Sequence, residues 1–202
     1  MNGWNEENCL IVMKNNCYSL DIIPKKFKTY KFYLKVVEQN SRVIELVPEE
    51  FKTEELCELA VKNYGNALAY IPEEFKTKKL CKLAVEKDVF ALEYVPEELK
   101  TKEICELAIK QNGYILKYVP IEFISKEVCE LAVKNGGYAL QWVPAELKTK
   151  ELCELAVKND GWALQFVPDE FKTAELCELA IKKVVIHYNS FQKNLKLQNY
   201  VY

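Results

Sequence analysis

The stretch PEELKTKEICELAIKQNGYILKYV, residues 96–119, decides the fold, because most of the chain repeats it. All seven prolines recur at one constant interval: Pro24, Pro48, Pro72, Pro96, Pro120, Pro144 and Pro168. Six cysteines keep the same interval, each at the same distance after a proline: Cys57, Cys81, Cys105, Cys129, Cys153 and Cys177. Self-similarity at a fixed period of this length predicts a stacked repeat array.

Each repeat divides into three predicted pieces. Proline, two acids and Phe or Leu predict one helical turn with the proline at its first helical position. Thr53 and its equivalents, with Ser125 in one repeat, are expected to cap the N-terminus of a longer helix, for example Glu54 to Asn63. Gly65 and its equivalents are expected to end that helix in the left-handed conformation. A short third piece follows, and the next proline stops it.

The longer helix has a wide apolar face, which fits a helix between two neighbours. We therefore expect an all-α, right-handed α-solenoid of about eight 24-residue repeats, each with one longer and one short helix, in a single repeat domain over residues 1–202. Residues 1–23 form a degenerate N-terminal cap, 24–167 form six repeats, and 168–202 form a last repeat that runs into a C-terminal capping helix over about 174–197. Whether the short helix is α or 3-10 stays open.

Charge and cysteine spacing exclude several classes of protein. With 28 basic and 30 acidic residues the net charge is −2, so there is no general attraction to nucleic acid or anionic membrane. No apolar run approaches the ~18–20 residues of a membrane span, and no secretory signal is recognisable. Equivalent cysteines of adjacent repeats should lie about 9–10 Å apart, too far for a disulfide. We expect buried thiols in a reducing cytoplasm, with delivery into a host cell's cytosol left open.

The sequence predicts no enzyme, because a catalytic site needs a group that is placed once in a special environment. Here the titratable residues recur as columns, and no Gly-rich phosphate loop or metal-ligand spacing occurs. The only histidine, His187, falls in the predicted closing helix. No catalytic, cofactor-binding or metal-binding residue is predicted.

Two columns of the third piece carry the functional prediction. The residue two before each proline is always apolar, so we expect it to pack against the next repeat: Ile22, Leu46, Tyr70, Tyr94, Tyr118, Trp142 and Phe166. The residue four earlier varies and includes large aromatics that packing does not require, which is typical of a protein-binding strip. At spacing i,i+4 the two columns should lie one above the other. With the variable column beside it, the candidate binding residues are Arg42, Asn66, Phe90, Tyr114, Lys117, Tyr138, Gln141, Trp162 and Gln165.

A second candidate surface is basic. The repeat 24–47 carries a local excess of lysine, which we interpret as a contact for an acidic protein surface or for a nucleic-acid backbone: Lys25, Lys26, Lys28, Lys31 and Lys35.

The repeat resembles the bacterial helical repeat family called domain of unknown function 4116, in a divergent form with a 24-residue period. The resemblance rests on Glu98–Leu99–Lys100, on Leu107–Ala108–Ile109–Lys110 with Gly113, and on Ala139–Leu140 with Trp142. It implies an α-helical interaction module of the kind found in intracellular-pathogen effectors and mobile-element proteins, with no catalytic residues. The repeat also resembles the leucine-rich repeat variant, which alternates α- and 3-10 helices and so implies a 3-10 third piece.

We therefore expect a non-enzymatic scaffold that binds, and could inhibit, a partner protein through the aromatic column, for example an anti-defence inhibitor or effector encoded by a phage or pathogen. The alternative is a helical repeat protein that binds single-stranded RNA by stacking bases on the aromatic residues.

Overall fold

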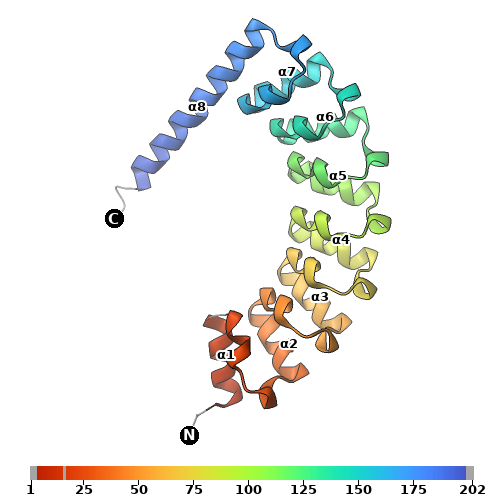
Figure 1. Ribbon diagram of the computed structural model, residues 1–202, viewed down its shortest axis with the longest axis vertical. Coiled ribbons are helices and arrows are strands. Elements are labelled where there is room, and N and C mark those ends of the chain that lie inside the picture. The colour runs from red at the N-terminus through yellow and green to blue at the C-terminus, as the bar shows by residue number, and fades with distance from the viewer. Residues whose placement is uncertain (1–3, 16, 199–202) are drawn as a thin grey trace. The chain divides into compact units, whose positions relative to one another are not determined.

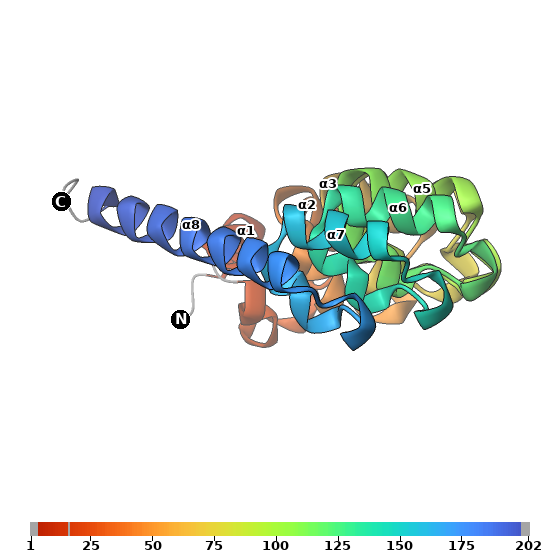
Figure 2. The same cartoon turned by 90° about the horizontal axis from the view of Figure 1, so that it is seen from above.

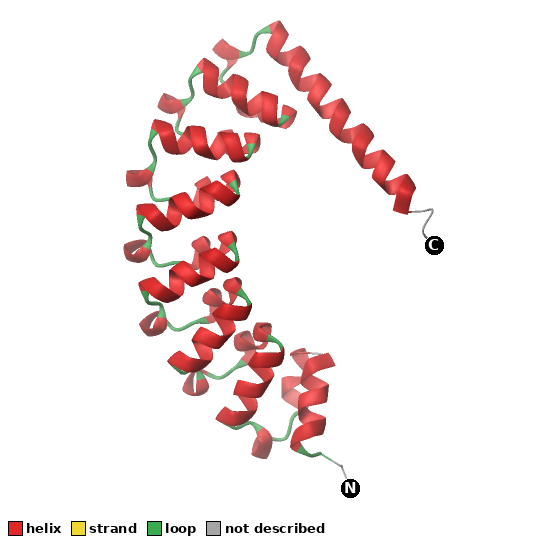
Figure 3. Cartoon of the chain, turned by 180° about the vertical axis from the view of Figure 1, so that it is seen from behind, coloured by secondary structure: helices red, strands yellow, loops and turns green. Residues whose placement is uncertain are grey.

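A computed structural model describes residues 4–15 and 17–198. Within these residues the chain is helical and shows no strand (Figure 3). Its α-helices are α1 (Glu6–Asn15), α2 (Tyr30–Gln39), α3 (Glu54–Asn63), α4 (Lys78–Lys87), α5 (Lys102–Gln111), α6 (Lys126–Asn135), α7 (Lys150–Asn159) and α8 (Ala174–Gln198). The predicted bounds Glu54 to Asn63 are confirmed, and the closing helix ends one residue later than expected.

The short elements of every repeat are 3-10 helices. Six-residue 3-10 helices follow the first seven α-helices of the described chain: η1 (Cys17–Ile22), η3 (Ser41–Leu46), η5 (Gly65–Tyr70), η7 (Val89–Tyr94), η9 (Gly113–Tyr118), η11 (Gly137–Trp142) and η13 (Gly161–Phe166). Three-residue 3-10 turns precede α2 to α8: η2 (Lys25–Phe27), η4 (Glu49–Phe51), η6 (Glu73–Phe75), η8 (Glu97–Leu99), η10 (Ile121–Phe123), η12 (Ala145–Leu147) and η14 (Asp169–Phe171). The fold is thus an all-α solenoid of helical repeats.

The chain divides into two compact units, unit 1 (residues 1–104) and unit 2 (residues 105–202). The boundary falls inside α5, so it does not separate whole repeats. Figure 1 shows α1 to α4 side by side within unit 1, and α6, α7 and the start of α8 within unit 2. The single domain over residues 1–202 stays a prediction, as do its two caps.

The repeats that contain α2 to α7 bury the same columns of side chains. In α3 the residues Leu56, Cys57, Ala60 and Val61 are all fully buried, and η5 adds Ala67. The helix face is therefore covered on two sides, as its width predicted. Because the core is built between repeats, a single repeat cannot bury its apolar face alone.

The helix starts follow the predicted capping. Thr53 Oγ1 accepts a hydrogen bond from Leu56 N at 3.3 Å, and equivalent bonds of 3.2–3.4 Å start α4 to α8. The proline is placed differently from the prediction. Pro48 is the N-cap of η4, with φ −59° and ψ 145°, so it precedes the first helical residue instead of occupying it. Its carbonyl accepts the first hydrogen bond of the turn, from Phe51 N at 2.9 Å.

The predicted left-handed glycines are wrong. None of the five described glycines has a positive φ. Each of the helices α2 to α7 is instead closed by an extended residue just before the glycine position, and the side chain of that residue often caps the following 3-10 helix, as Asp88 Oδ1 accepts from Phe90 N at 3.0 Å. Glycine is needed for close approach: a Cβ on Gly137 would overlap the carbonyl oxygen of Ala156 in the next repeat. The same contact joins Gly65 to Ala84.

A buried lysine ties the two ends of a repeat together. Lys52 Nζ donates to Glu49 Oε1 at 2.7 Å and to the carbonyl oxygen of Tyr70 at 2.9 Å, so its buried charge is paired with a carboxylate and hydrogen-bonded to the backbone. Lys148 reaches the Phe166 carbonyl in the same way at 3.2 Å. Sequence reasoning missed this contact, because a lysine after a helical turn usually faces solvent.

Gly137→Ala should lower the free energy of unfolding by about 1–3 kcal/mol, because its Cβ overlaps the neighbouring backbone. Gly136→Ala is the matched control. A Cβ on Gly136 meets nothing closer than 3.9 Å, and its φ of −179° suits any residue. This variant should be neutral or more stable by about 0.5 kcal/mol. Urea unfolding followed by circular dichroism measures both, and equal losses would contradict the close-approach role.

The cysteines provide a second prediction. Burial raises the pKa of the Cys57, Cys81 and Cys129 thiols from 9.0 to about 11, whereas Cys177 is only partly buried. At pH 8 iodoacetamide should modify Cys177 and leave those three unmodified, as peptide mapping by mass spectrometry would show. Since their folded-state pKa is raised, the stability that they contribute should be complete below pH 9 and decline as the pH rises to about 11. Rapid native labelling of Cys129 would contradict their burial. The side chain of Cys17 lies outside the described part of the chain.

Candidate functional site

Four aromatic rings from three successive repeats of unit 2 contact one another, and we call them the aromatic face: Tyr114, Tyr138, Trp142 and Phe166. Tyr114 and Tyr138 are stacked, with ring centroids 6.1 Å apart and an interplanar angle of 28°. Trp142 meets Tyr114 edge-on at 6.4 Å, and Phe166 meets Tyr138 edge-on at 4.8 Å. The rings support one another in defined orientations.

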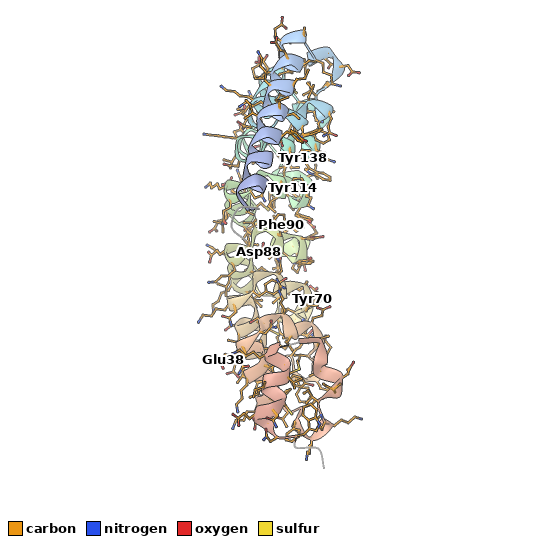
Figure 4. The ribbon with its side chains drawn as sticks, turned by 90° about the vertical axis from the view of Figure 1, so that its left-hand side faces the viewer. Glu38, Tyr70, Asp88, Phe90, Tyr114 and Tyr138 are labelled. Carbon is orange, nitrogen blue, oxygen red and sulfur yellow. The ribbon has the colours of Figure 1, made fainter. Side chains whose placement is uncertain are left out.

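The geometry of the 3-10 helix sets which side chains meet. Three residues per turn bring i and i+3 into line, so the predicted i,i+4 alignment within one repeat is wrong. The ring that Tyr114 meets edge-on is Trp142, which belongs to the next repeat. Figure 4 labels Tyr114 and Tyr138 on neighbouring repeats of unit 2, on the same side. The two columns therefore interleave across repeats.

The i+3 residues form a polar edge along the aromatic face. Lys117 Nζ lies over the rings of Tyr114 and Tyr118, 5.1 and 4.2 Å from their centroids. Gln141 and Gln165 are exposed, and Gln165 Nε2 donates to the Trp162 carbonyl at 3.0 Å. An aromatic centre with a polar edge is the usual composition of a protein interface.

Exposure differs between the two columns in a way that the sequence did not predict. Trp142, expected to pack inside, is 38% exposed, and Tyr70 and Tyr94 of unit 1 are similar. Tyr114 and Tyr138, expected at the surface, are half-buried because their rings stack. Trp162 is 59% exposed. Trp142 and Phe166 are thus members of the site that sequence reasoning missed, because an invariably apolar column resembles core.

In unit 1 two of the three equivalent positions hold polar side chains that make contacts. Arg42 lies over the ring of Tyr64 at 5.2 Å, and the Asn66 side chain donates to Asp88. Phe90, two residues after Asp88, is 41% exposed, and both residues are labelled in Figure 4. Of the nine candidate residues, unit 1 therefore holds Arg42, Asn66 and Phe90, and unit 2 holds the three aromatic residues Tyr114, Tyr138 and Trp162 with the polar Lys117, Gln141 and Gln165.

A hollow of about 460 Å³ lies beside the stacked tyrosines. It is lined by Asn112, Tyr114, Lys134, Asn135, Gly136, Gly137, Tyr138, Ala139, Asn159 and Asp160. Gly136 leaves it open, because the equivalent residues of the other repeats carry side chains: Asn40, Tyr64, Asp88, Asn112 and Asp160. The hollow is large enough to admit one side chain of a partner.

The basic patch is partly neutralised within unit 1. Lys25, Lys26 and Lys31 are exposed, and Lys28 and Lys35 are half-buried. Lys35 Nζ lies 2.6 Å from Glu6 Oε1, and this hydrogen bond and charge hold the pKa of Glu6 below its usual value. Lys26 lies over the neighbouring Phe27 ring. The patch thus offers fewer unpaired charges than its composition suggests.

Metal-binding clusters and membrane-spanning helices are both absent from the described part of the chain. Within residues 4–15 and 17–198 no cluster of three or more His, Cys, Asp or Glu side chains could hold a metal ion. No helix in that part of the chain is long and apolar enough to cross a membrane. The side chain of His187 lies outside the described part.

Comparison with curated proteins and with solved structures gives no match. A family model does match the chain six times, over residues 29–76, 53–100, 77–124, 101–148, 125–172 and 149–196. Each match begins one repeat after the previous one, so the offset equals the period of the prolines. Each match covers two repeats, and together they span residues 29–196. The chain therefore belongs to the family described as a domain of unknown function, DUF4116.

Proposed function

We propose that the protein is a non-enzymatic scaffold that binds another protein through the aromatic face of unit 2. The observation that carries this proposal is the contact of four partly exposed rings from three repeats, edged by Lys117, Gln141 and Gln165. Packing within a repeat does not require the Tyr114 and Tyr138 rings, because unit 1 folds with Arg42 and Asn66 at equivalent positions.

Two physical arguments support the aromatic face as an interface. Tyr and Trp are enriched among the residues that contribute most binding energy. The rings are held by one another and by repeats with rigid backbone contacts, so a partner loses little free energy in ordering them. A partner with an apolar centre and hydrogen-bonding groups at its edge would complement this surface. A scaffold of this kind could inhibit its partner by occupying its surface, as a phage- or pathogen-encoded inhibitor would.

Replacing Tyr114, Tyr138 and Trp142 together by alanine should weaken binding of a captured partner at least about 100-fold, since anchor residues often contribute about 2 kcal/mol or more each. Affinity capture from a native lysate with mass spectrometry identifies the partner, and titration with the purified partner measures the dissociation constant. The matched control is Tyr70→Ala with Tyr94→Ala, which removes two exposed rings from unit 1. An unchanged partner and affinity in the folded triple variant would contradict the proposal.

Binding of single-stranded RNA has weaker support. A base held between two rings needs about 6.8 Å between them, twice the stacking rise. Tyr114 and Tyr138 are 6.1 Å apart and already stack on each other. We therefore expect no gel shift of single-stranded RNA at low salt. A salt-dependent shift that is lost in the Lys25→Ala/Lys26→Ala/Lys31→Ala variant would favour the nucleic-acid function instead.

A further inference from the structure

The last repeat lacks an element that every earlier repeat possesses. Helix α8 runs on to Gln198, whereas the described helices α1 to α7 are each followed by a six-residue 3-10 helix. Val185 stands at the position that begins the 3-10 helices, which is glycine in four repeats but Ser41 in η3 and Val89 in η7, so the residue type alone does not account for the longer helix. Figures 1 and 2 show α8 continuing past α7 as one straight helix within unit 2. The position of an eighth 3-10 helix is therefore unfilled by the described chain.

In earlier repeats this position is a packed seat. The helix η13, for example, lies against η11 and α7. The seat beneath it includes Leu140, Ala156 and Val157, and all three are fully buried. The 3-10 helices η3, η5, η7, η9 and η11 share a pair of apolar residues, third and fourth in order, that is buried in the stack, such as Ala67 with Leu68 in η5.

At the end of unit 2 the same seat is open. Ile181, the equivalent of the fully buried Val157, is 64% exposed. Leu164, the equivalent of the fully buried Leu140, is only half-buried. The opening is a pocket of about 500 Å³ lined by Gly161, Trp162, Leu164, Gln165, Lys172, Ala180, Ile181, Val184 and Val185. Its wall is almost entirely apolar, and in the preceding repeat the equivalent residues line a filled seat.

We propose that this end seat binds a short segment of a partner protein that adopts the 3-10 form of the missing helix, with a small apolar residue followed by leucine. The end seat continues the interface between successive repeats. The side chains that fill the equivalent seat in earlier repeats therefore indicate which side chains a partner segment should present. The inference does not depend on the aromatic face being an interface, because it rests on Ile181, Val184 and Val185 of α8.

A second copy of the chain is a poorer occupant than a separate partner. The 3-10 helices η5, η7 and η11 already bury their apolar pairs completely in their own stacks, for example Ala91 with Leu92. A second copy could offer one of them only by unfolding a repeat. A partner with an unengaged segment has no such cost.

The test uses a peptide that copies residues 64–72 of this chain, YGNALAYIP, and the full-length protein labelled with nitrogen-15. We expect saturable shifts at the Trp162 indole and at the amides of Ile181, Val184 and Val185. The affinity should be weak, with a dissociation constant of about 0.1–1 mM, because the peptide must become ordered. Leu68→Asp in the peptide, or Ile181→Lys in the protein, should weaken binding at least about tenfold.

The matched control is Ile186→Lys. Ile186 is as exposed as Ile181 and lies on the same helix, but it does not line the end seat, so affinity should be unchanged. Tyr114→Ala with Tyr138→Ala should also leave peptide binding unchanged, which separates this test from that of the aromatic face. Absence of saturable shifts at several millimolar peptide overturns the inference, as do shifts confined to the aromatic face. Light scattering tests whether the wild-type protein self-associates. Self-association that Ile181→Lys abolishes would assign the end seat to a second copy of the chain and would overturn the inference too.

Discussion

The approach of one backbone to another between repeats is the constraint on which this fold depends. A glycine at the start of a 3-10 helix lies against the carbonyl of an alanine in the next α-helix, as Gly137 does against Ala156. A Cβ would overlap the neighbouring backbone at these glycines, so glycine permits the close approach of these repeats, whereas Ser41 and Val89 take the equivalent position in two other repeats. Cys57 and Val61 are fully buried and fill the space between adjacent repeats with small side chains.

Stacking and the proposed recognition use different residues of one repeat. The residues that stack the repeats, such as Gly137 and Ala156, face the neighbouring repeat and are buried. The residues of the aromatic face lie on the 3-10 helices, where one turn takes three residues and side chains three apart share a side. Changing Tyr114 to Asn or Arg would leave the stack intact, as Asn66 and Arg42 demonstrate in unit 1. The surface can therefore change without loss of the fold.

The sequence predicted the repeat and the N-caps of its helices but not how successive repeats contact one another. The proline period, the helix from Glu54 to Asn63 and the Thr53 cap are local features, which one repeat specifies by itself. Gly137 was misinterpreted because glycine serves both left-handed turns and close approach, and only the neighbouring repeat distinguishes them. The aromatic face was predicted only in part, because it too depends on contacts between repeats. Tyr114 was found as a variable aromatic residue, but its contact with Trp142 depends on 3-10 geometry and on a second repeat.

The buried lysine has a consequence for how such a chain changes over time. Lys52 joins Glu49 to the Tyr70 carbonyl, so the first and last elements of a repeat are fastened to each other. Duplication or deletion of one whole repeat segment would carry this fastening along and recreate the same junctions on both sides. Array length is then free to vary by whole copies. Each added copy would extend the array by one repeat and would add one more variable position equivalent to Tyr114.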